Sequence, residues 1–218
     1  MIATQDYSNQ HSIQRRFHNI AIGGRKGHGK DCLAQYLAIV YGYNRVAFAT
    51  PLRLKAARQL VSDLGMTIDE ALRVLEHPAE KEKFRVLMQN TGMEEREKDK
   101  DHWVKESGII TAQGLNVVSD ARFMNEVLAI ERKPGISIFV RARWAEKSVS
   151  EDATLGHVSE ALGPESYNVT ATVPYGIVEA VGYYDRLLRR LFGFPKPDEF
   201  KIEEFGAWMA EHIERGNK

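Results

Sequence analysis

One glycine-rich segment near the N-terminus has the residue types and the spacing of a phosphate-binding loop. Residues 24–30 read Gly-Arg-Lys-Gly-His-Gly-Lys and fit the pattern G-x-x-x-x-G-K. Glycines let successive backbone N–H groups turn toward phosphate oxygens, and the helix that follows adds the positive end of its dipole. Lys30 is expected to reach the β- and γ-phosphoryl groups of a nucleoside triphosphate. The candidate cradle residues are Gly24, Gly27, His28 and Gly29, with the His28 side chain pointing outward.

The two residues that follow the loop lysine depart from the usual sequence of a phosphate-binding loop. Asp31 takes the place of the Ser or Thr whose hydroxyl binds Mg²⁺, and as a carboxylate it is a candidate metal ligand, directly or through water. Cys32 stands where many such loops have a second hydroxyl near the α-phosphate. Because a thiol is a weak donor, Cys32 either makes a poor phosphate contact or packs the first helix as a small apolar residue.

The flanking sequence must place this loop between a strand and a helix. Apolar runs that predict strands occur at 18–22, 46–49, 115–119, 136–140 and 169–173. Helical patterns cover 31–41, 51–64, 70–75, a charged segment 79–105 with breaks near 92 and 100, a stretch through 126 and 130, 181–191, and the tail from 195. This alternation predicts an α/β fold with a mainly parallel five-stranded sheet flanked by helices. The alternative interpretation of the glycine-rich loop is an ordinary strand-to-helix turn that binds no ligand.

Composition narrows the classes of function. The 218 residues include 30 Lys and Arg against 30 Asp and Glu, so no overall basic field exists to hold nucleic acid or a membrane surface. The lone Cys32 excludes an intramolecular disulfide and a cysteine zinc site. No apolar run approaches the ~20 residues of a membrane span, and the first residues lack the apolar core of a signal peptide. We therefore expect a cytoplasmic protein without a membrane or nucleic-acid partner.

The chain is expected to divide into three parts. Residues 1–17 form a flexible N-terminal arm, 18–194 form the main domain, and 195–218 form a C-terminal helical extension that docks through Phe200, Phe205 and Trp208. Within the main domain, the polar stretch 144–164 lacks periodicity and is interpreted as a lid or as an ordinary surface loop.

Several blocks in a fixed order resemble the bacteriophage deoxynucleoside monophosphate kinases, a branch of the P-loop kinases. Residues 27–31 are similar to the family's G-x-G-K-D, 48–53 to F-A-D-P-L-K, and 85–92 to R-x-L-L-Q-x-L-G. Arg96 and 102–104 resemble a later Arg and D-x-W-V. Residues 118–126 are close to V-x-D-V-R-F-x-N-E, and 157–160 match H-x-S-E. The departures are Cys32 for Thr, Thr50 for Asp and His102 for Asp.

The resemblance implies a P-loop kinase fold with a lid, and transfer of the γ-phosphoryl group of ATP, with Mg²⁺, to a deoxynucleoside monophosphate. Lys30, Arg122 and Arg143 then become the catalytic candidates. Arg141 and Arg143 join the ATP-binding set, and both flank the lid stretch together with His157. Asp120 follows a strand end and either binds Mg²⁺ or the acceptor, or caps the next helix. The candidate acceptor-binding residues are Arg53, Arg85, Gln89, Arg96, Trp103, Asp120 and Arg122.

Each of these assignments has a plainer alternative. Arg85 and Arg96 lie in a segment dense with Lys and Glu, where a solvated helix face is the alternative, and Trp103 either stacks on a base or packs in a core. Other functions also remain open: a different P-loop small-molecule kinase, similar to the dephospho-coenzyme A or phosphomevalonate kinases, or a non-catalytic ATP-binding regulator. The accepted bases and a possible homodimer are left undecided by the sequence.

Overall fold

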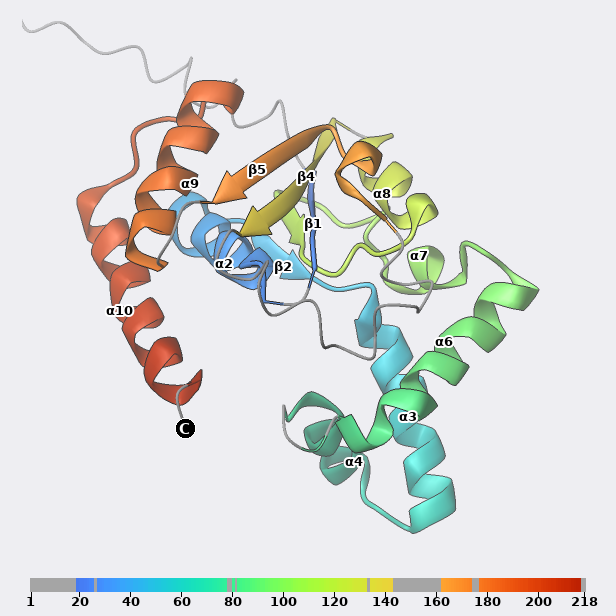
Figure 1. Cartoon of the computed structure of the whole chain (residues 1–218). Coiled ribbons are helices and arrows are strands. Elements are labelled where there is room, and N and C mark those ends of the chain that lie inside the picture. The colour runs from blue at the N-terminus through green and yellow to red at the C-terminus, as the bar shows by residue number, and fades with distance from the viewer. Residues whose placement is uncertain are drawn as a thin grey trace, which may run out of the picture. The chain divides into compact units, whose positions relative to one another are not determined.

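The computed structural model describes residues 19–25, 27–77, 80, 82–132, 134–142, 162–173 and 177–216 (Figure 1). Contacts divide the chain into two compact units. The sheet unit takes the residues up to 45 and those from 113 onward, and the helical unit takes residues 46–112. The expected N-terminal arm, 1–17, lies outside the described residues.

The sheet unit is built on five strands in the order β2-β3-β1-β4-β5. The strands are β1 (Asn19–Gly23), β2 (Asn44–Val46), β3 (Asn116–Val118), β4 (Gly135–Ala142) and β5 (Val169–Val173). The pairings of β1 with β3, of β1 with β4 and of β4 with β5 are parallel. All five residues of β1 are buried, as in a parallel strand covered on both faces. The α/β class with a five-stranded parallel sheet flanked by helices is confirmed.

The second strand is where the prediction from sequence was wrong. The apolar run 46–49 was expected to be a strand, but β2 ends at Val46 and helix α3 begins at Ala49. The backbone N–H of Thr50 donates to the Ala47 carbonyl at 3.2 Å, and Phe48 is buried just ahead of the helix. A short apolar run fits a buried helix start as well as a strand, so periodicity alone did not separate the two.

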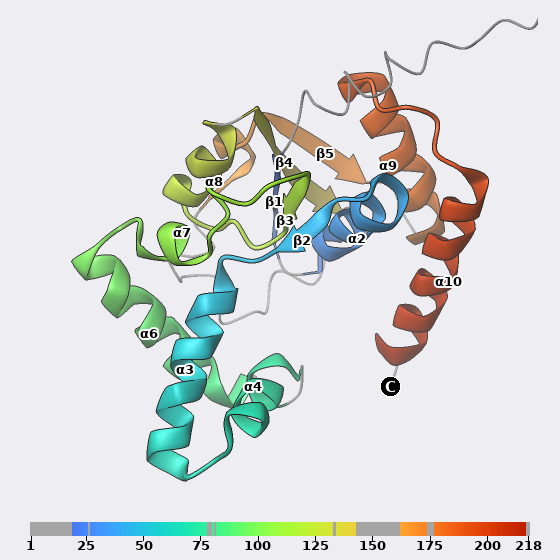
Figure 2. The same ribbon diagram turned by 180° about the vertical axis from the view of Figure 1, so that it is seen from behind.

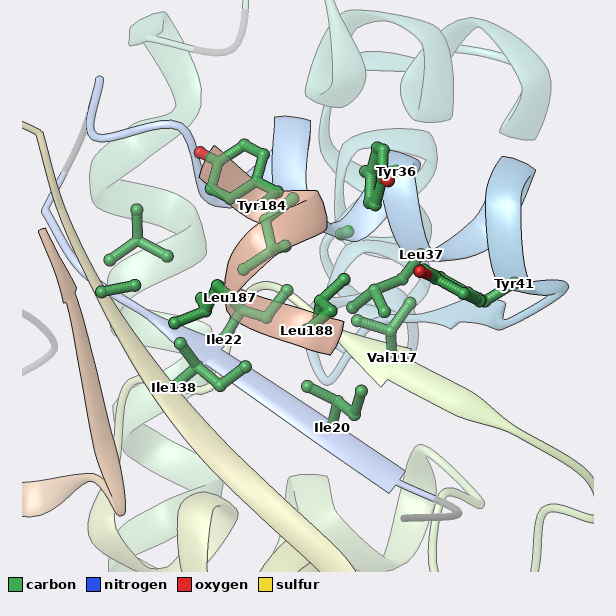
Figure 3. Packing of buried hydrophobic residues seen from close by; sticks show 14 of the residues in the cluster. Ile20, Ile22, Tyr36, Leu37, Tyr41, Val117, Ile138, Tyr184, Leu187 and Leu188 are labelled. Atoms are coloured by element: carbon green, nitrogen blue, oxygen red, sulfur yellow. The ribbon is translucent and has the colours of Figure 1, made fainter. Parts of the chain in front are cut away.

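Helices cover both faces of this sheet (Figures 1 and 2). Helices α2 (Lys30–Tyr41), α9 (Ile177–Phe192) and α10 (Glu199–Gly216) lie over one face, and α8 (Met124–Glu131) lies over the other. Figure 3 shows how the first face is filled. Fully or largely buried side chains from the strands meet those of α2 and α9, namely Ile20, Ile22, Val117, Ile138, Tyr36, Leu37, Tyr41, Tyr184, Leu187 and Leu188.

The C-terminal helix α10 packs on this core. Phe205 of α10 is fully buried, and its ring meets Tyr36 edge-on with centroids 5.1 Å apart. Trp208 stacks on Phe205 at 5.6 Å. Docking through Phe205 and Trp208 is therefore confirmed, whereas Phe200 is 67% exposed and its expected docking was wrong.

The helical unit consists of α3 (Ala49–Leu64), α4 (Ile68–Glu76), a 3₁₀ turn η1 (Glu82–Phe84), α6 (Arg85–Lys98) and α7 (His102–Glu106). Its small core joins α3 and α4 through Ala56, Ala57, Leu60, Ala71, Val74 and Leu75. The break expected near residue 100 is confirmed, but α6 runs unbroken through Gly92, so the other expected break was wrong. Gly92 is buried there, and a Cβ on it would lie 3.5 Å from Leu52 Cδ2 of α3.

One carboxylate, Glu95, ties the helices of this unit together. Glu95 Oε1 accepts hydrogen bonds from Lys55 of α3 and from Lys98 at 3.1 Å, and Nδ1 of His102 lies 3.9 Å from its Oε2. The hydrogen bonds with the two lysines lower the pKa of Glu95 from 4.5 to about 2. Because the folded-state pKa is depressed, this stabilisation is complete above about pH 4.5 and is lost as the pH falls through about 2.

Glu95→Gln is therefore expected to lower the free energy of unfolding at pH 7, and the difference from the unmodified protein should shrink as the pH is lowered from 5 toward 3. The measurement is urea unfolding followed by circular dichroism across that range. The control is Glu94→Gln, because Glu94 is exposed on the same helix and pairs with the same Lys98. A Glu95→Gln effect that does not change with pH would contradict the assignment.

Among the helices of the described ranges, none is long and apolar enough to cross a membrane.

Candidate functional site

The glycine-rich loop lies where the sequence predicts it, between β1 and α2. Gly24, Gly27 and Gly29 have φ values of 132°, 77° and 85°, a region that side chains rarely adopt. Gly29 occupies the N-cap position of α2. A Cβ on Gly24 would also lie only 2.3 Å from the Val140 carbonyl oxygen of β4. The path of the chain at these positions therefore requires glycine for steric reasons.

Lys30 is the first residue of α2 and turns back over the loop. Its Nζ donates a hydrogen bond to the Arg25 carbonyl oxygen at 2.8 Å. This contact holds the ammonium group beside the loop backbone and next to the positive end of the helix dipole. A loop with a lysine charge and a helix N-terminus in one place can bind an anion.

His28 differs from the expectation that its side chain points outward. The residue is only 4% exposed, and the backbone N–H of Ala142, at the end of β4, donates to its Nδ1 at 3.3 Å. Because Nδ1 accepts, this nitrogen carries no proton, and in the neutral ring the proton is on Nε2. The imidazole therefore attaches the loop to the end of β4, and its expected position was wrong.

The loop lies at the edge of the sheet where the connections that leave two neighbouring strands go to opposite faces. The chain leaving β1 enters α2 on one face, and the chain leaving the neighbouring β3 enters α8 on the other. Open parallel sheets bind ligands outside the carboxyl ends of strands at such a point. Ser119 and Asp120 directly follow β3 there. The Ser119 hydroxyl donates to Asp31 Oδ1 at 2.7 Å, so the end of β3 and the start of α2 are joined.

Asp31 also forms an ion pair with Arg45, a residue that no sequence motif identified. Arg45 Nη2 lies 3.2 Å from Asp31 Oδ1, and Arg45 Nη1 donates to Gln35 Oε1 at 2.8 Å. The Asp31 side chain remains 75% exposed and the Arg45 side chain 40% exposed. Arg45 lies on β2, the strand that was misplaced, so no motif connected it with the loop.

The donors at this edge suit a hard cation that is held largely by phosphate. In the part of the chain that the structure describes, no group of three or more His, Cys, Asp and Glu residues is arranged to hold a metal ion by itself. The Asp31 carboxylate, the Ser119 hydroxyl and the Asp120 carboxylate are oxygen donors, which Mg²⁺ prefers, and Mg²⁺ commonly keeps several waters and binds substrate phosphates.

The contacts of Cys32 favour the packing alternative. Its thiol donates to Met209 Sδ of α10 at 3.3 Å, and it packs against the main core. Burial, with a smaller contribution from the Asp31 charge, raises the pKa of Cys32 to about 12, so the thiol stays protonated. On the same side, the Tyr184 hydroxyl of α9 donates to the Gly29 carbonyl oxygen at 3.3 Å. Helices α9 and α10 therefore support the loop and the first turn of α2 from the core.

Arg122 follows the end of β3, as the sequence predicts, and the structure shows that it is exposed. Its backbone N–H and that of Phe123 donate to Glu126 Oε2 at 2.8 and 3.2 Å. Glu126 is 1% exposed and lies in the first turn of α8. The N-cap position of α8 is Phe123, so Asp120 is not the cap of that helix and stays at the carboxyl edge of the sheet.

The other arginine candidates for the acceptor phosphate lie in the helical unit, where each has a protein partner. Arg53 Nη1 lies 3.6 Å from Glu76, Arg85 donates to Glu82 at 3.0 Å, and Arg96 Nη1 donates to the Gly92 carbonyl at 3.2 Å. The first two pairs involve carboxylates that are 62% and 58% exposed, which is the pattern of a solvated helix surface. Gln89 is half-buried on α6.

Trp103 belongs to the interior of the helical unit. Its side chain is 2% exposed, and its indole N–H donates to the Gly92 carbonyl at 3.0 Å. The face of the ring is therefore not open to a base, and the prediction of stacking was wrong. The sequence could not decide this point because a tryptophan beside a helix start fits both roles.

The predicted lid lies mostly beyond the reach of the structure. Arg141 is exposed near the end of β4. Arg143, His157 and the stretch 144–161 lie outside the described residues, whereas Pro164–Ser166 form a 3₁₀ turn, η4, ahead of β5.

Comparison with models of protein families finds no match for this chain, and a search of curated proteins finds no similar sequence.

Proposed function

We propose that this protein is a P-loop kinase that transfers the γ-phosphoryl group of ATP to a deoxynucleoside monophosphate. The observation that carries the proposal is the loop between β1 and α2. It combines three glycines with positive φ, a lysine at the first helical position, and a hydrogen bond that Asp31 accepts from Ser119, the serine that follows the adjacent strand. The resemblance of the ordered blocks to the bacteriophage deoxynucleoside monophosphate kinases supplies the substrate class.

The chain's own groups suit the binding and positioning that phosphoryl transfer requires. The amides of residues 24 and 27–31 bind the β-phosphate, and Lys30 exchanges its contact with the Arg25 carbonyl for a γ-phosphoryl oxygen. Asp31 and Asp120 would hold Mg²⁺, which when bound would neutralise negative charge on the phosphate oxygens. Arg122 adds a positive charge at the same edge. Phosphoryl transfer needs little covalent chemistry from the protein, so positioning and charge neutralisation account for catalysis.

The resemblance, and not a geometry between the two units, supplies the candidates for the acceptor phosphate, which are Arg53, Arg85, Arg96 and Arg122, and the candidate for reading the base, Gln89. An arginine fork matches two oxygens of a phosphate. The existing pairs of Arg53 and Arg85 do not oppose this role, because exposed ion pairs stabilise by only about 0–1 kcal/mol and exchange readily. Trp103 is left out of the proposed base site because it is buried.

The test is turnover with ATP, Mg²⁺ and each common deoxy- and ribonucleoside monophosphate in turn, with ADP and nucleoside diphosphate both quantified. At least one deoxynucleoside monophosphate is expected to be converted with kcat on the order of 1–100 s⁻¹. Dephospho-coenzyme A and phosphomevalonate serve as comparison acceptors. Phosphorylation of one of these instead, or ATP binding without transfer to any acceptor, would contradict the proposal.

A further inference from the structure

We propose that Arg45 is a positioning residue of the phosphate loop, because it compensates the negative charge that Asp31 places in an anion site. This inference rests on the proposed function and concerns the same site. Its basis is the contact of Arg45 Nη2 with Asp31 Oδ1 at 3.2 Å, on the residue that directly follows the loop lysine.

A carboxylate at this position is an electrostatic problem for the loop. Most loops of this pattern carry an uncharged Ser or Thr after the lysine, whereas Asp31 puts a full negative charge in the first turn of α2. That charge partly cancels the helix dipole and Lys30, the two features that attract a polyphosphate. Without a counter-charge, Asp31 would repel the triphosphate.

The structure places a counter-charge beside Asp31. Arg45 is oriented by two acceptors on successive turns of α2, Asp31 Oδ1 at 3.2 Å and Gln35 Oε1 at 2.8 Å. Ser119 donates to the same Asp31 oxygen at 2.7 Å. Both donors converge on Oδ1, so the carboxylate is neutralised and held while its side chain stays exposed. Arg45 therefore acts on the phosphates through Asp31 and touches neither substrate.

Asp31 has two possible roles, a charge that Arg45 screens or a metal ligand alone, and they predict different polyphosphate affinities. If Arg45 screens Asp31, its removal should weaken the binding of any polyphosphate even without a metal, and removal of the Asp31 charge should reverse the loss. If Asp31 acts only as a metal ligand, Arg45 has no effect in metal-free solution.

The experiment measures binding of ATP and of inorganic tripolyphosphate by calorimetric titration in EDTA, with the unmodified protein and four variants. Arg45→Gln is expected to weaken binding about tenfold, as an order of magnitude for a nearby unit charge in partly screened surroundings. Arg45→Lys should retain most of the affinity. The double variant Arg45→Gln with Asp31→Asn should return to within about threefold of the unmodified protein.

The fourth variant, Arg190→Ala, is the control. Arg190 is exposed on α9, so this substitution removes one positive charge away from the loop. Circular dichroism melts check that each variant is folded. If Arg45→Gln binds as tightly as the unmodified protein, or if Asp31→Asn fails to restore its binding, the inference is wrong and the proposed function stands. If the unmodified protein binds neither polyphosphate, even with Mg²⁺, both are wrong.

Discussion

Lys30→Met is expected to lower kcat for phosphoryl transfer by about 100- to 1,000-fold, the range seen when one group that stabilises transition-state charge is removed. The reason is local. Lys30 begins α2, and its ammonium group already lies at the loop, 2.8 Å from the Arg25 carbonyl oxygen. Methionine keeps the length of the side chain but removes the charge that the γ-phosphoryl group would meet.

The measurement for Lys30→Met is steady-state turnover with the best acceptor, alongside the unfolding midpoint. The stability should change little, because the hydrogen bond of the Lys30 side chain to the Arg25 carbonyl lies in an exposed part of the loop. Lys201→Met is the matched control, since Lys201 pairs with the half-exposed Glu204 on α10. Near-normal turnover in Lys30→Met would show that this loop is not the site of transfer.

Gly24→Ala is expected to be the most destabilising single methyl addition in the loop. Its Cβ would lie 2.3 Å from the Val140 carbonyl oxygen, and its φ of 132° is one that alanine rarely adopts. Overpacking costs about 1–3 kcal/mol, and a forbidden backbone conformation adds about 1–3 kcal/mol. The free energy of unfolding should therefore fall by about 2–6 kcal/mol.

Gly42→Ala separates the two causes. Gly42, which ends α2, has a φ of 73° but nothing within 4 Å of an added Cβ. Its substitution should cost about 1–2 kcal/mol from the backbone alone. Urea unfolding of both variants gives the comparison, and the excess loss in Gly24→Ala measures the clash with β4. Equal losses would mean that the loop moves away from β4 freely.

Strands that are apolar throughout and end at a glycine or a polar residue could be predicted from the sequence. β1, for example, is a buried run that ends at Gly23, directly before Gly24 begins the loop. β2 was misplaced because the apolar side chains of Ala47 and Phe48 lead into a helix. The strand itself is Asn44–Val46, which has exposed polar residues and no apolar pattern. Its place in the sheet is set by pairing with residues that lie far away in the sequence.

The phosphate loop was found because its chemistry is contained in seven consecutive residues. The contacts around it depend on the fold and could not be found in that way. Ser119 is 88 residues from Asp31, and Met209 is 177 residues from Cys32. His28 was misplaced for a related reason, since its partner is a backbone N–H of β4 that no sequence pattern identifies.

The most direct test of the proposed site is a crystal structure of the protein with Mg²⁺ and a non-hydrolysable ATP analogue. We expect the β-phosphate to lie in the loop of residues 24–30, with Lys30 Nζ moved from the Arg25 carbonyl to a phosphate oxygen and Asp31 and Ser119 on the metal side. A triphosphate bound elsewhere, with Lys30 still on Arg25, would contradict the assignment of this loop as the ATP site.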